Sequence, residues 1–219
     1  MKIGVIGATP ADTQMGVNII QSSGFNVSHR TVASDPDEIV TIYNTQPDTL
    51  QQRYERFVEE VMTEGAEKIF IYSNSLSAMV DYQIVARTLH IPTVTPLEAY
   101  QALPDIYQNV LNLCATGASA SDIEHYTCLN QPKRRVISLS HLPLVEAIEE
   151  ARDPIDIIYA FRLDKFFEYA NSLTGSKDAF DVILLGCTHF PYLRDALEGL
   201  TDIPLFDPAT YMLEALATK

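Results

Sequence analysis

The chain has 219 residues, of which 47% are apolar, and its formal net charge is −14. This length can bury a full core as one large or two small domains. The acidic balance without a basic stripe argues against nucleic acid as a partner, and no run of about 18 apolar residues predicts a membrane span. The three cysteines are odd in number and widely spaced, which argues against a disulfide framework or a metal site and favours a reducing, cytoplasmic setting.

The first half of the chain alternates apolar strands with helices. The run over residues 66–72 is almost continuously apolar, which predicts a buried parallel strand. Apolar residues at helical spacing between Leu50 and Val61 predict a helix that Gly65 ends. The expected strands cover residues 2–6, 26–32 and 66–72, and the expected helices cover 13–22, 50–64 and 76–89, with a loop at 34–38.

The second half continues the alternation. Asp153 as cap and Pro154 in the first turn predict the start of one helix, and the basic cluster 133–135 is interpreted as the solvated entrance to a strand. The closing helix is expected to pack back on the first lobe. The expected strands cover residues 110–115, 136–139 and 180–185, and the expected helices cover 97–106, 121–126, 142–151, 154–168, 192–200 and 208–217.

One pattern occurs twice: an apolar strand, a small polar turn, a helix, an Ile-Pro pair and a second short strand. The first copy has its turn at Ser73 and its proline at Pro92, 19 positions later; the second has Cys187 and Pro204, 17 positions apart. Internal symmetry then makes Ser73 and Cys187 equivalent. The repeat therefore predicts two lobes with a cleft between them whose chemistry comes from both faces.

Strands that alternate with helices predict an α/β fold, with two pseudo-symmetric lobes that each contain a mainly parallel sheet flanked by helices. We expect the N-terminal lobe to comprise residues 1–95 plus 207–219 and the C-terminal lobe residues 96–206. Ligands sit at the carboxyl ends of such strands. Four turns built from small and hydroxyl residues are therefore expected near one another, at 7–12, 73–75, 116–119 and 187–189.

The strongest candidate for catalysis is Cys187, which follows a buried strand and Gly186 and opens the next expected helix. A helix N-terminus lowers the pKa of a thiol from its ordinary value of about 8.5 and stabilises the thiolate. A buried core cysteine is the alternative interpretation. Thr188 and His189 favour function, because core turns rarely need three adjacent reactive side chains, and His189 could orient or protonate a neighbour.

Ser73, Asn74 and Ser75 occupy the equivalent turn. Asn74 and Ser75 can donate to a carboxylate together with the free amides of a helix start. A helix cap is the alternative, and both interpretations can hold together. Ser73 cannot serve as a base by itself, because an unassisted hydroxyl is far too weakly acidic.

Two further turns follow strands. Thr116, Gly117 and Ser119 suit a loop that approaches ligand oxygens, with an ordinary strand-to-helix turn as an equal alternative. The segment over residues 4–9 superficially resembles a dinucleotide site, but the full glycine fingerprint is absent. We therefore reject a dinucleotide cofactor.

Residues 185–193, LGCTHFPYL, resemble the second cysteine motif of glutamate racemases and, more broadly, the aspartate/glutamate racemase superfamily. The Thr-His after the cysteine is nearer to the glutamate branch. Ser73-Asn74-Ser75 falls where the family has Cys-Asn-Thr. Residues 115–119 are similar to the family's mid-chain Thr loop, and 143–149 to a later segment. The resemblance spans nearly the whole chain, and only the Cys187 motif is specific by itself.

The resemblance implies a cofactor-independent mechanism on a small, acidic amino acid. One cysteine, as thiolate, removes the α-proton, and a second, as thiol, delivers a proton to the opposite face. Cys187 would be one of this pair, assisted by His189. Family members are commonly dimers, so a homodimer is implied. The α-carboxylate would be held by Asn74, Ser75, Thr116 and Thr188, with Thr9 and Ser119 completing the predicted binding set.

The sequence departs from the family in two places. Ser73 stands at the first cysteine's position, and the acidic residue expected after the first strand is replaced within Gly7-Ala8-Thr9. Two-base racemisation needs an acid and a base on opposite faces. The serine therefore predicts impaired turnover or a form that traps substrate.

Two alternatives to a racemase remain open from the sequence. One is a one-cysteine enzyme like the superfamily's decarboxylase branch, in which Cys187 protonates a carbanion after carbon dioxide leaves. Ser73 would be no handicap there, because only one face needs an acid. The other is a non-catalytic binder of amino acids or carboxylates that kept the pocket.

Overall fold

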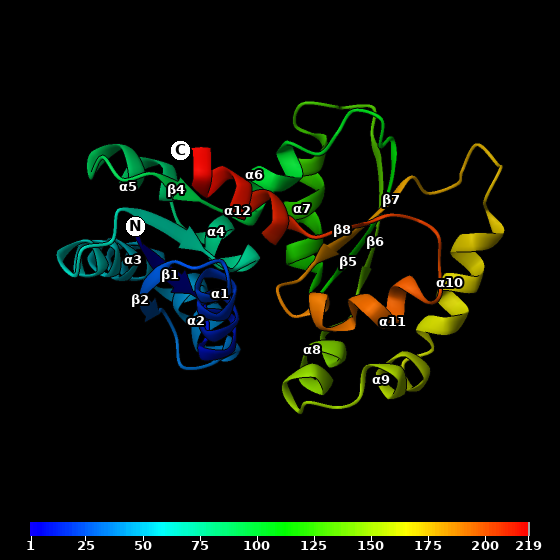
Figure 1. The fold of residues 1–219 in the computed structure, drawn as a ribbon, viewed down its shortest axis with the longest axis horizontal. Coiled ribbons are helices and arrows are strands. Elements are labelled where there is room, and N and C mark those ends of the chain that lie inside the picture. The colour runs from blue at the N-terminus through cyan, green and yellow to red at the C-terminus, as the bar shows by residue number, and fades with distance from the viewer. Residues whose placement is uncertain (219) are drawn as a thin grey trace. The chain divides into compact units, whose positions relative to one another are not determined.

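The computed structural model describes residues 1–218, with the side chains of all of these except Pro36, Val40 and Tyr43. Strands and helices alternate along the chain (Figure 1). Contacts between residues divide it into two compact units. Unit 1 runs from Met1 to Ala99 and includes the C-terminal segment from Ala209, and unit 2 is Tyr100–Pro208. The sequence-based division lay at residues 95 and 206.

Unit 1 contains a four-stranded parallel sheet in the order β2-β1-β3-β4. Apolar side chains of β1 and β3 pack against Met212 and Leu216 of the last helix, α12 (Pro208–Thr218), so this C-terminal helix completes the core of unit 1. The strands are β1 (Lys2–Gly7), β2 (Asn26–Thr31), β3 (Lys68–Ile71) and β4 (Thr93–Val94).

The helices of unit 1 correct the sequence prediction in two places. The expected loop at 34–38 begins a helix, because the Asp35 side chain accepts a hydrogen bond from the Glu38 amide at 2.8 Å and caps it. The expected helix at 76–89 is split, since the Asp81 amide donates to Gln51 Oε1 at 2.8 Å. Besides α12, the helices of unit 1 are α1 (Pro10–Ser22), α2 (Pro36–Thr45), α3 (Pro47–Thr63), α4 (Asn74–Met79), α5 (Tyr82–Thr88) and α6 (Pro96–Gln101), the last of which crosses the unit boundary.

Unit 2 contains a second four-stranded parallel sheet, in the order β6-β5-β7-β8. The expected α/β architecture of two parallel sheets flanked by helices is therefore confirmed. The strands are β5 (Asn109–Cys114), β6 (Arg135–Ser140), β7 (Val182–Gly186) and β8 (Leu205–Phe206).

The helices of unit 2 also depart from the prediction. The expected helix at 154–168 is broken at Arg162, whose φ of 57° is left-handed. The segment after Cys187 forms a 3-10 helix, η1 (Phe190–Leu193), before any α-helix begins. The α-helices are α7 (Gly117–Cys128), α8 (Leu142–Glu149), α9 (Pro154–Ala160), α10 (Leu163–Ser172) and α11 (Arg194–Glu198).

The registers of the two sheets reveal the repeat at the level of single residues. Ile6 pairs with Ile71 in unit 1, and Leu113 pairs with Leu185 in unit 2. Ile6 and Leu113 each lie three residues before a capping threonine, Thr9 and Thr116 respectively, so they are equivalent. Their partners are then equivalent as well.

Two residues beyond those partners stand Ser73 and Cys187, which this register makes equivalent positions. A second pair of hydrogen bonds gives the same alignment, because each begins four residues before one of these positions. The Ile69 amide donates to Pro92 O at 2.8 Å, and the Ile183 amide donates to Pro204 O at 2.9 Å. Two independent points in the hydrogen-bond pattern thus support the equivalence that the sequence repeat suggested.

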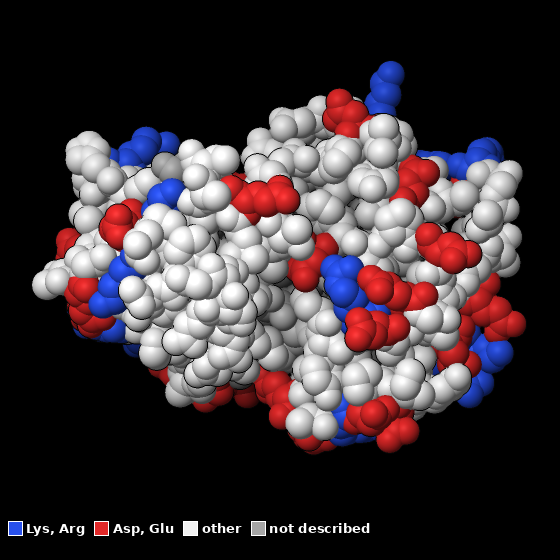
Figure 2. Space-filling view, in the orientation of Figure 1, with Lys and Arg blue, Asp and Glu red and all other residues white. Residues whose placement is uncertain are grey.

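The surface carries many charges of both signs. On the face shown in Figure 2, acidic and basic side chains are interspersed. Some form pairs one helical turn apart, such as Arg194 with Glu198 at 3.1 Å; an exposed pair of this kind contributes well under about 1 kcal/mol. Within residues 1–218, no helix is both long and apolar enough to cross a membrane.

Arg134 differs from these exposed basic residues, because it is only 5% exposed. The cluster 133–135 was interpreted as a solvated strand entrance, and for Arg134 that interpretation is wrong. Burial lowers the pKa of its guanidinium. The group donates to four backbone carbonyls, those of Tyr107 and Thr127 at 2.7 Å, Leu103 at 3.1 Å and Pro104 at 3.0 Å. It therefore ties the segment before β5 to the end of α7.

Replacing Arg134 should destabilise unit 2. Arg134→Met removes the donor of four carbonyls, two of them in fully buried hydrogen bonds, and we expect the free energy of unfolding to fall by at least about 3 kcal/mol. Arg135→Met is the matched control, because Arg135 is exposed and paired with Asp178 at 3.0 Å; its effect should stay within about 1 kcal/mol. Urea unfolding followed by circular dichroism measures both. Equal effects would contradict the role given to Arg134.

Candidate active site

Cys187 is held at the carboxyl end of β7, a strand whose five residues are all buried. Its own exposure is 8%. Gly186 precedes it, and a Cβ at this position would collide with Asn112 Oδ1 and with the backbone of Leu113. The absence of a side chain at Gly186 therefore lets β7 lie close to β5 and fixes where Cys187 begins.

The expected helix N-terminus at Cys187 is not observed. Three residues, 187–189, lie between the end of β7 and the start of η1, and the Phe190 amide donates to Cys187 O at 3.0 Å in a turn. A four-residue 3-10 helix offers little dipole. The helix-dipole argument for a thiolate at Cys187 therefore does not apply.

A histidine and a carboxylate lie in line with that thiol. Cys187 Sγ is 3.6 Å from His189 Nδ1, and His189 Nε2 is 3.0 Å from Glu149 Oε1. The imidazole is 5% exposed, whereas the side chain of Glu149 is 40% exposed. With Nε2 protonated and donating to Glu149, Nδ1 presents a lone pair to the thiol. This arrangement can take up the thiol proton and stabilise the resulting imidazolium.

Glu149 is the site residue that sequence reasoning missed. It is the last residue of α8, and 40 positions separate it from His189. It falls inside the segment 143–149 that resembles the family, but no local pattern marks a carboxylate at the end of an amphipathic helix as functional. Only the placement of α8 after β6, next to β5 in the sheet, brings it to the histidine.

The turn after β3 has the same layout with different chemistry. Ser73 is 1% exposed, and its hydroxyl caps α4 by accepting from the Leu76 amide at 3.4 Å. Its Oγ also lies 3.3 Å from Ser75 Oγ. Because Ser73 is equivalent to Cys187, Ser75 is equivalent to His189. A pair of hydroxyls thus replaces the thiol–imidazole pair, and neither can act as a base near neutral pH.

The remaining predicted binding residues lie in the turns next to these. Thr9 accepts from the Asp12 amide at 3.4 Å, and Thr116 accepts from the Ser119 amide at 3.2 Å, with the two hydroxyls of Thr116 and Ser119 3.0 Å apart. Both threonines therefore cap the helices that follow them, α1 and α7. Thr188 Oγ1 lies 3.4 Å from His189 Nδ1.

Within each unit, strand pairing brings these turns to one edge of the sheet. Cys114 at the end of β5 pairs with Gly186 at the end of β7, so the Thr116 turn lies beside the Cys187 turn. In unit 1, the Tyr72 amide donates to Ile6 O at 3.2 Å, which sets the Ser73 turn beside the Thr9 turn. Each unit therefore offers one reactive or small side chain next to one threonine-capped helix.

Cys114, Cys128 and Cys187 form no disulfide bond. Cys114 is buried, and burial raises the pKa of its thiol. Over residues 1–218, no cluster of three or more histidine, cysteine, aspartate or glutamate side chains is arranged to hold a metal ion.

Known proteins that are similar to this chain include glutamate racemases. No protein-family model matches the chain. Glutamate racemase from Desulforudis audaxviator is 27% identical over 177 residues, which are 77% of this chain and 61% of that protein. The chain thus spans less than two thirds of the length of that curated relative.

Solved structures match over almost the whole chain. Glutamate racemase from Francisella tularensis, solved in complex with D-glutamate, has a TM-score of 0.69 at 22% identity. The match covers 99% of this chain and 81% of that protein. An aspartate racemase homologue from Pyrococcus horikoshii has a TM-score of 0.64 at 20% identity, and the match covers 99% of this chain and 97% of that protein. The chain therefore has the fold of these racemase structures. The resemblance that the Cys187 motif suggested is confirmed at this level.

The position of Cys187 in this superfamily fold depends on Gly186, and a substitution there tests it. Gly186→Ala places a methyl group against Asn112 and Leu113, and we expect a loss of about 1–3 kcal/mol in the free energy of unfolding and an altered rate of Cys187 thiol modification. Gly117→Ala is the control, because a Cβ at Gly117 meets open space. Thermal unfolding and thiol-reagent kinetics distinguish the two variants. Equal tolerance of both would contradict the packing argument.

Proposed function

We propose that the chain is a cofactor-independent enzyme of the amino-acid racemase type, which transfers the α-proton of a small, acidic amino acid. The observation that carries this proposal is the connected array of Cys187, His189 and Glu149. The sequence relative and the solved structures support it, since they are glutamate racemases and an aspartate racemase homologue.

In the proposed reaction, His189 accepts the thiol proton of Cys187, and the thiolate removes the α-proton of the substrate. The electron pair of the broken C–H bond moves into the substrate carboxylate, which becomes more basic and needs stronger hydrogen bonds in the transition state. Hydroxyl and amide donors of the turns would hold it: Thr9, Asn74, Ser75, Thr116, Ser119 and Thr188. The proton then returns from Cys187 to carbon.

The proposal assigns the opposite face of the α-carbon to Ser73. Two-base racemisation requires this hydroxyl to deliver or remove a proton, and its pair with Ser75 contains no titratable group. We therefore propose that proton transfer is efficient on the Cys187 face only. The substrate would exchange its α-proton with solvent chiefly with retention, and inversion would be slow.

The decarboxylase-like alternative also uses one cysteine, but no comparison favours it, and the Thr-His that follows Cys187 is typical of the glutamate branch. A homodimer and a cytoplasmic location remain part of the proposal; the family resemblance supports the first, and three cysteines without a disulfide bond support the second.

Proton exchange in deuterated water tests the assignment of the two faces. With L- or D-glutamate or aspartate as substrate, we expect deuterium at the α-carbon of one enantiomer without matching inversion. Cys187→Ala should abolish this exchange, and Ser73→Cys should raise the inversion rate at least tenfold, because a thiol is several pKa units more acidic than a hydroxyl. Proton NMR follows exchange, and chiral chromatography follows inversion.

Cys128→Ser is the control for that experiment, since Cys128 lies at the end of α7 and outside the array. Its exchange rate should equal that of the unmodified chain. If neither the chain nor Ser73→Cys exchanges any of the four amino acids, the proposed function is wrong. Carbon dioxide release from a substituted malonate that depends on Cys187 would instead support the decarboxylase alternative.

Glu149 should act through His189 and so affect the pH dependence. Glu149→Gln keeps the size of the side chain but removes the negative charge that stabilises the imidazolium. We expect the exchange rate to fall about 10–100-fold and the pH–rate profile to shift. Glu150→Gln, at the exposed neighbouring position, should leave both unchanged. A uniform loss of rate with no change in the profile would indicate a purely structural role for Glu149.

A further inference from the structure

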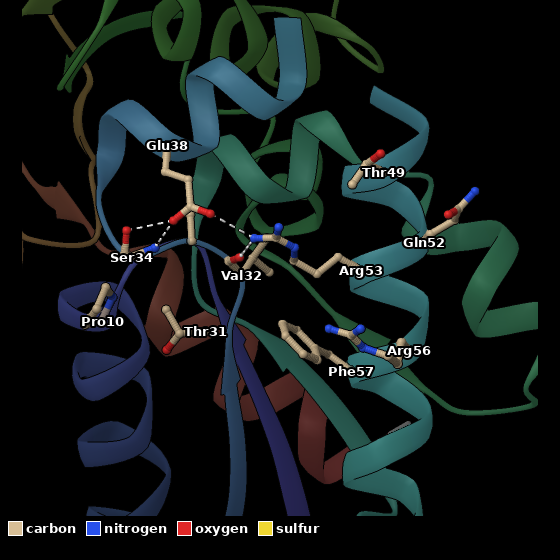
Figure 3. Close-up of a pocket in the computed structure, with 11 residues that line it drawn as sticks. Pro10, Thr31, Val32, Ser34, Glu38, Thr49, Gln52, Arg53, Arg56 and Phe57 are labelled. Carbon is tan, nitrogen blue, oxygen red and sulfur yellow. Dashed lines mark hydrogen bonds and ion pairs between the residues drawn. The ribbon is translucent and has the colours of Figure 1, made fainter. Parts of the chain in front are cut away.

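A hollow of about 710 Å³ lies in unit 1 at the carboxyl end of β2. Its walls come from the start of α1, the segment after β2, and helices α2 and α3 (Figure 3). Pockets for small molecules have volumes of about 300–1,000 Å³. In parallel α/β sheets, ligands sit beyond the carboxyl ends of the strands. Size and place therefore both suit a small ligand.

Arg53 is fixed at one side of this hollow. Its Nη1 donates to Val32 O at 2.7 Å and to Glu38 Oε1 at 3.1 Å. Among the residues whose side chains are described, Nε and Nη2 of Arg53 have no hydrogen-bond partner. A guanidinium held by two bonds on one edge, with donors left on the other, is prearranged to receive an oxyanion.

Both carboxylate oxygens of Glu38 accept hydrogen bonds, from Arg53 and from Ser34 in the loop before α2. Its Oε2 accepts from the amide and from the hydroxyl of Ser34, both at 2.7 Å. These bonds and Arg53 lower the pKa of Glu38 to about 2, so the carboxylate is ionised at neutral pH. Because both of its oxygens already accept, it has little capacity left to bind a cationic ligand.

Arg56 adds a second positive charge one helical turn along α3. Its guanidinium lies over the ring of Phe57, 5.0 Å from the centroid, and its Nε is 3.5 Å from Glu60. The side chain is 62% exposed. Figure 3 shows Arg53 and Phe57 pointing from α3 toward the segment that follows β2. The lining thus contains two guanidinium groups and one carboxylate, a local positive excess in a chain of net charge −14.

We infer that this hollow binds a small organic anion with a carboxylate or phosphate group and an aromatic or apolar portion. The acidic group is held by Arg53 and Arg56, with the hydroxyls of Thr31 and Thr49 in the same lining, and the apolar portion packs on Phe57. The inference does not rest on the proposed racemase activity.

Residue-resolved NMR titration of the full chain tests this site. Phenyl phosphate and benzoate are the probes, and benzyl alcohol is the neutral analogue. We expect at least one of the two anions to shift the amide signals of Ser34, Thr49 and Arg53 saturably, with benzyl alcohol at least fivefold weaker. Whichever anion binds more tightly identifies the acidic group.

Matched variants separate this site from non-specific attraction. Arg56→Gln should weaken the binding of the tighter anion at least fivefold, and it should fold normally because Arg56 is exposed. Arg87→Gln removes the same charge from an exposed position on α5 and should leave the affinity unchanged. The inference is overturned if neither anion gives saturable shifts at these amides, if benzyl alcohol binds equally well, or if the two variants behave alike.

Discussion

The pairing of β7 with β5 is the constraint on which the candidate site depends. It matches Cys114 with Gly186 and so sets the thiol of Cys187 beside the Thr116 turn. The register cannot slip by one residue, because every side chain of the buried strand would then change faces. Gly186 supplies the close approach that this register needs. Backbone hydrogen bonds, rather than the reactive residues themselves, therefore place the thiol.

The two units use the same scaffold for different chemistry. Both sheets have the same strand order, and in both the turn after the third strand holds a side chain that contacts the side chain two positions later. In unit 2 this contact joins a thiol to an imidazole backed by a carboxylate, whereas in unit 1 it joins two hydroxyls. In the proposed function, a repeat that keeps the geometry while changing the side chains separates substrate binding from proton transfer, because hydroxyls can still donate to a carboxylate.

Much of this arrangement could be predicted from the sequence, and the exceptions have physical causes. The parallel strands follow from apolar runs, and the Ser73–Cys187 equivalence follows from repeated Ile-Pro spacing. The break at Arg162 could not be predicted, because a non-glycine residue gives no sign of a left-handed backbone. The split at Asp81 depends on Gln51, which is distant in sequence. Glu149 likewise reaches His189 only through tertiary packing.

The last helix has a consequence for how the chain is made. Unit 2 is one continuous stretch and can finish folding as soon as it has left the ribosome. Unit 1 is interrupted, since Met212 and Leu216 of α12 complete its core and the carbonyl of Leu216 accepts from Lys68 Nζ. Until α12 is synthesised, one apolar face of the sheet of unit 1 stays uncovered. Most of unit 1 is therefore translated before unit 2 but sealed from water after it, and in the interval its uncovered face is open to chaperones.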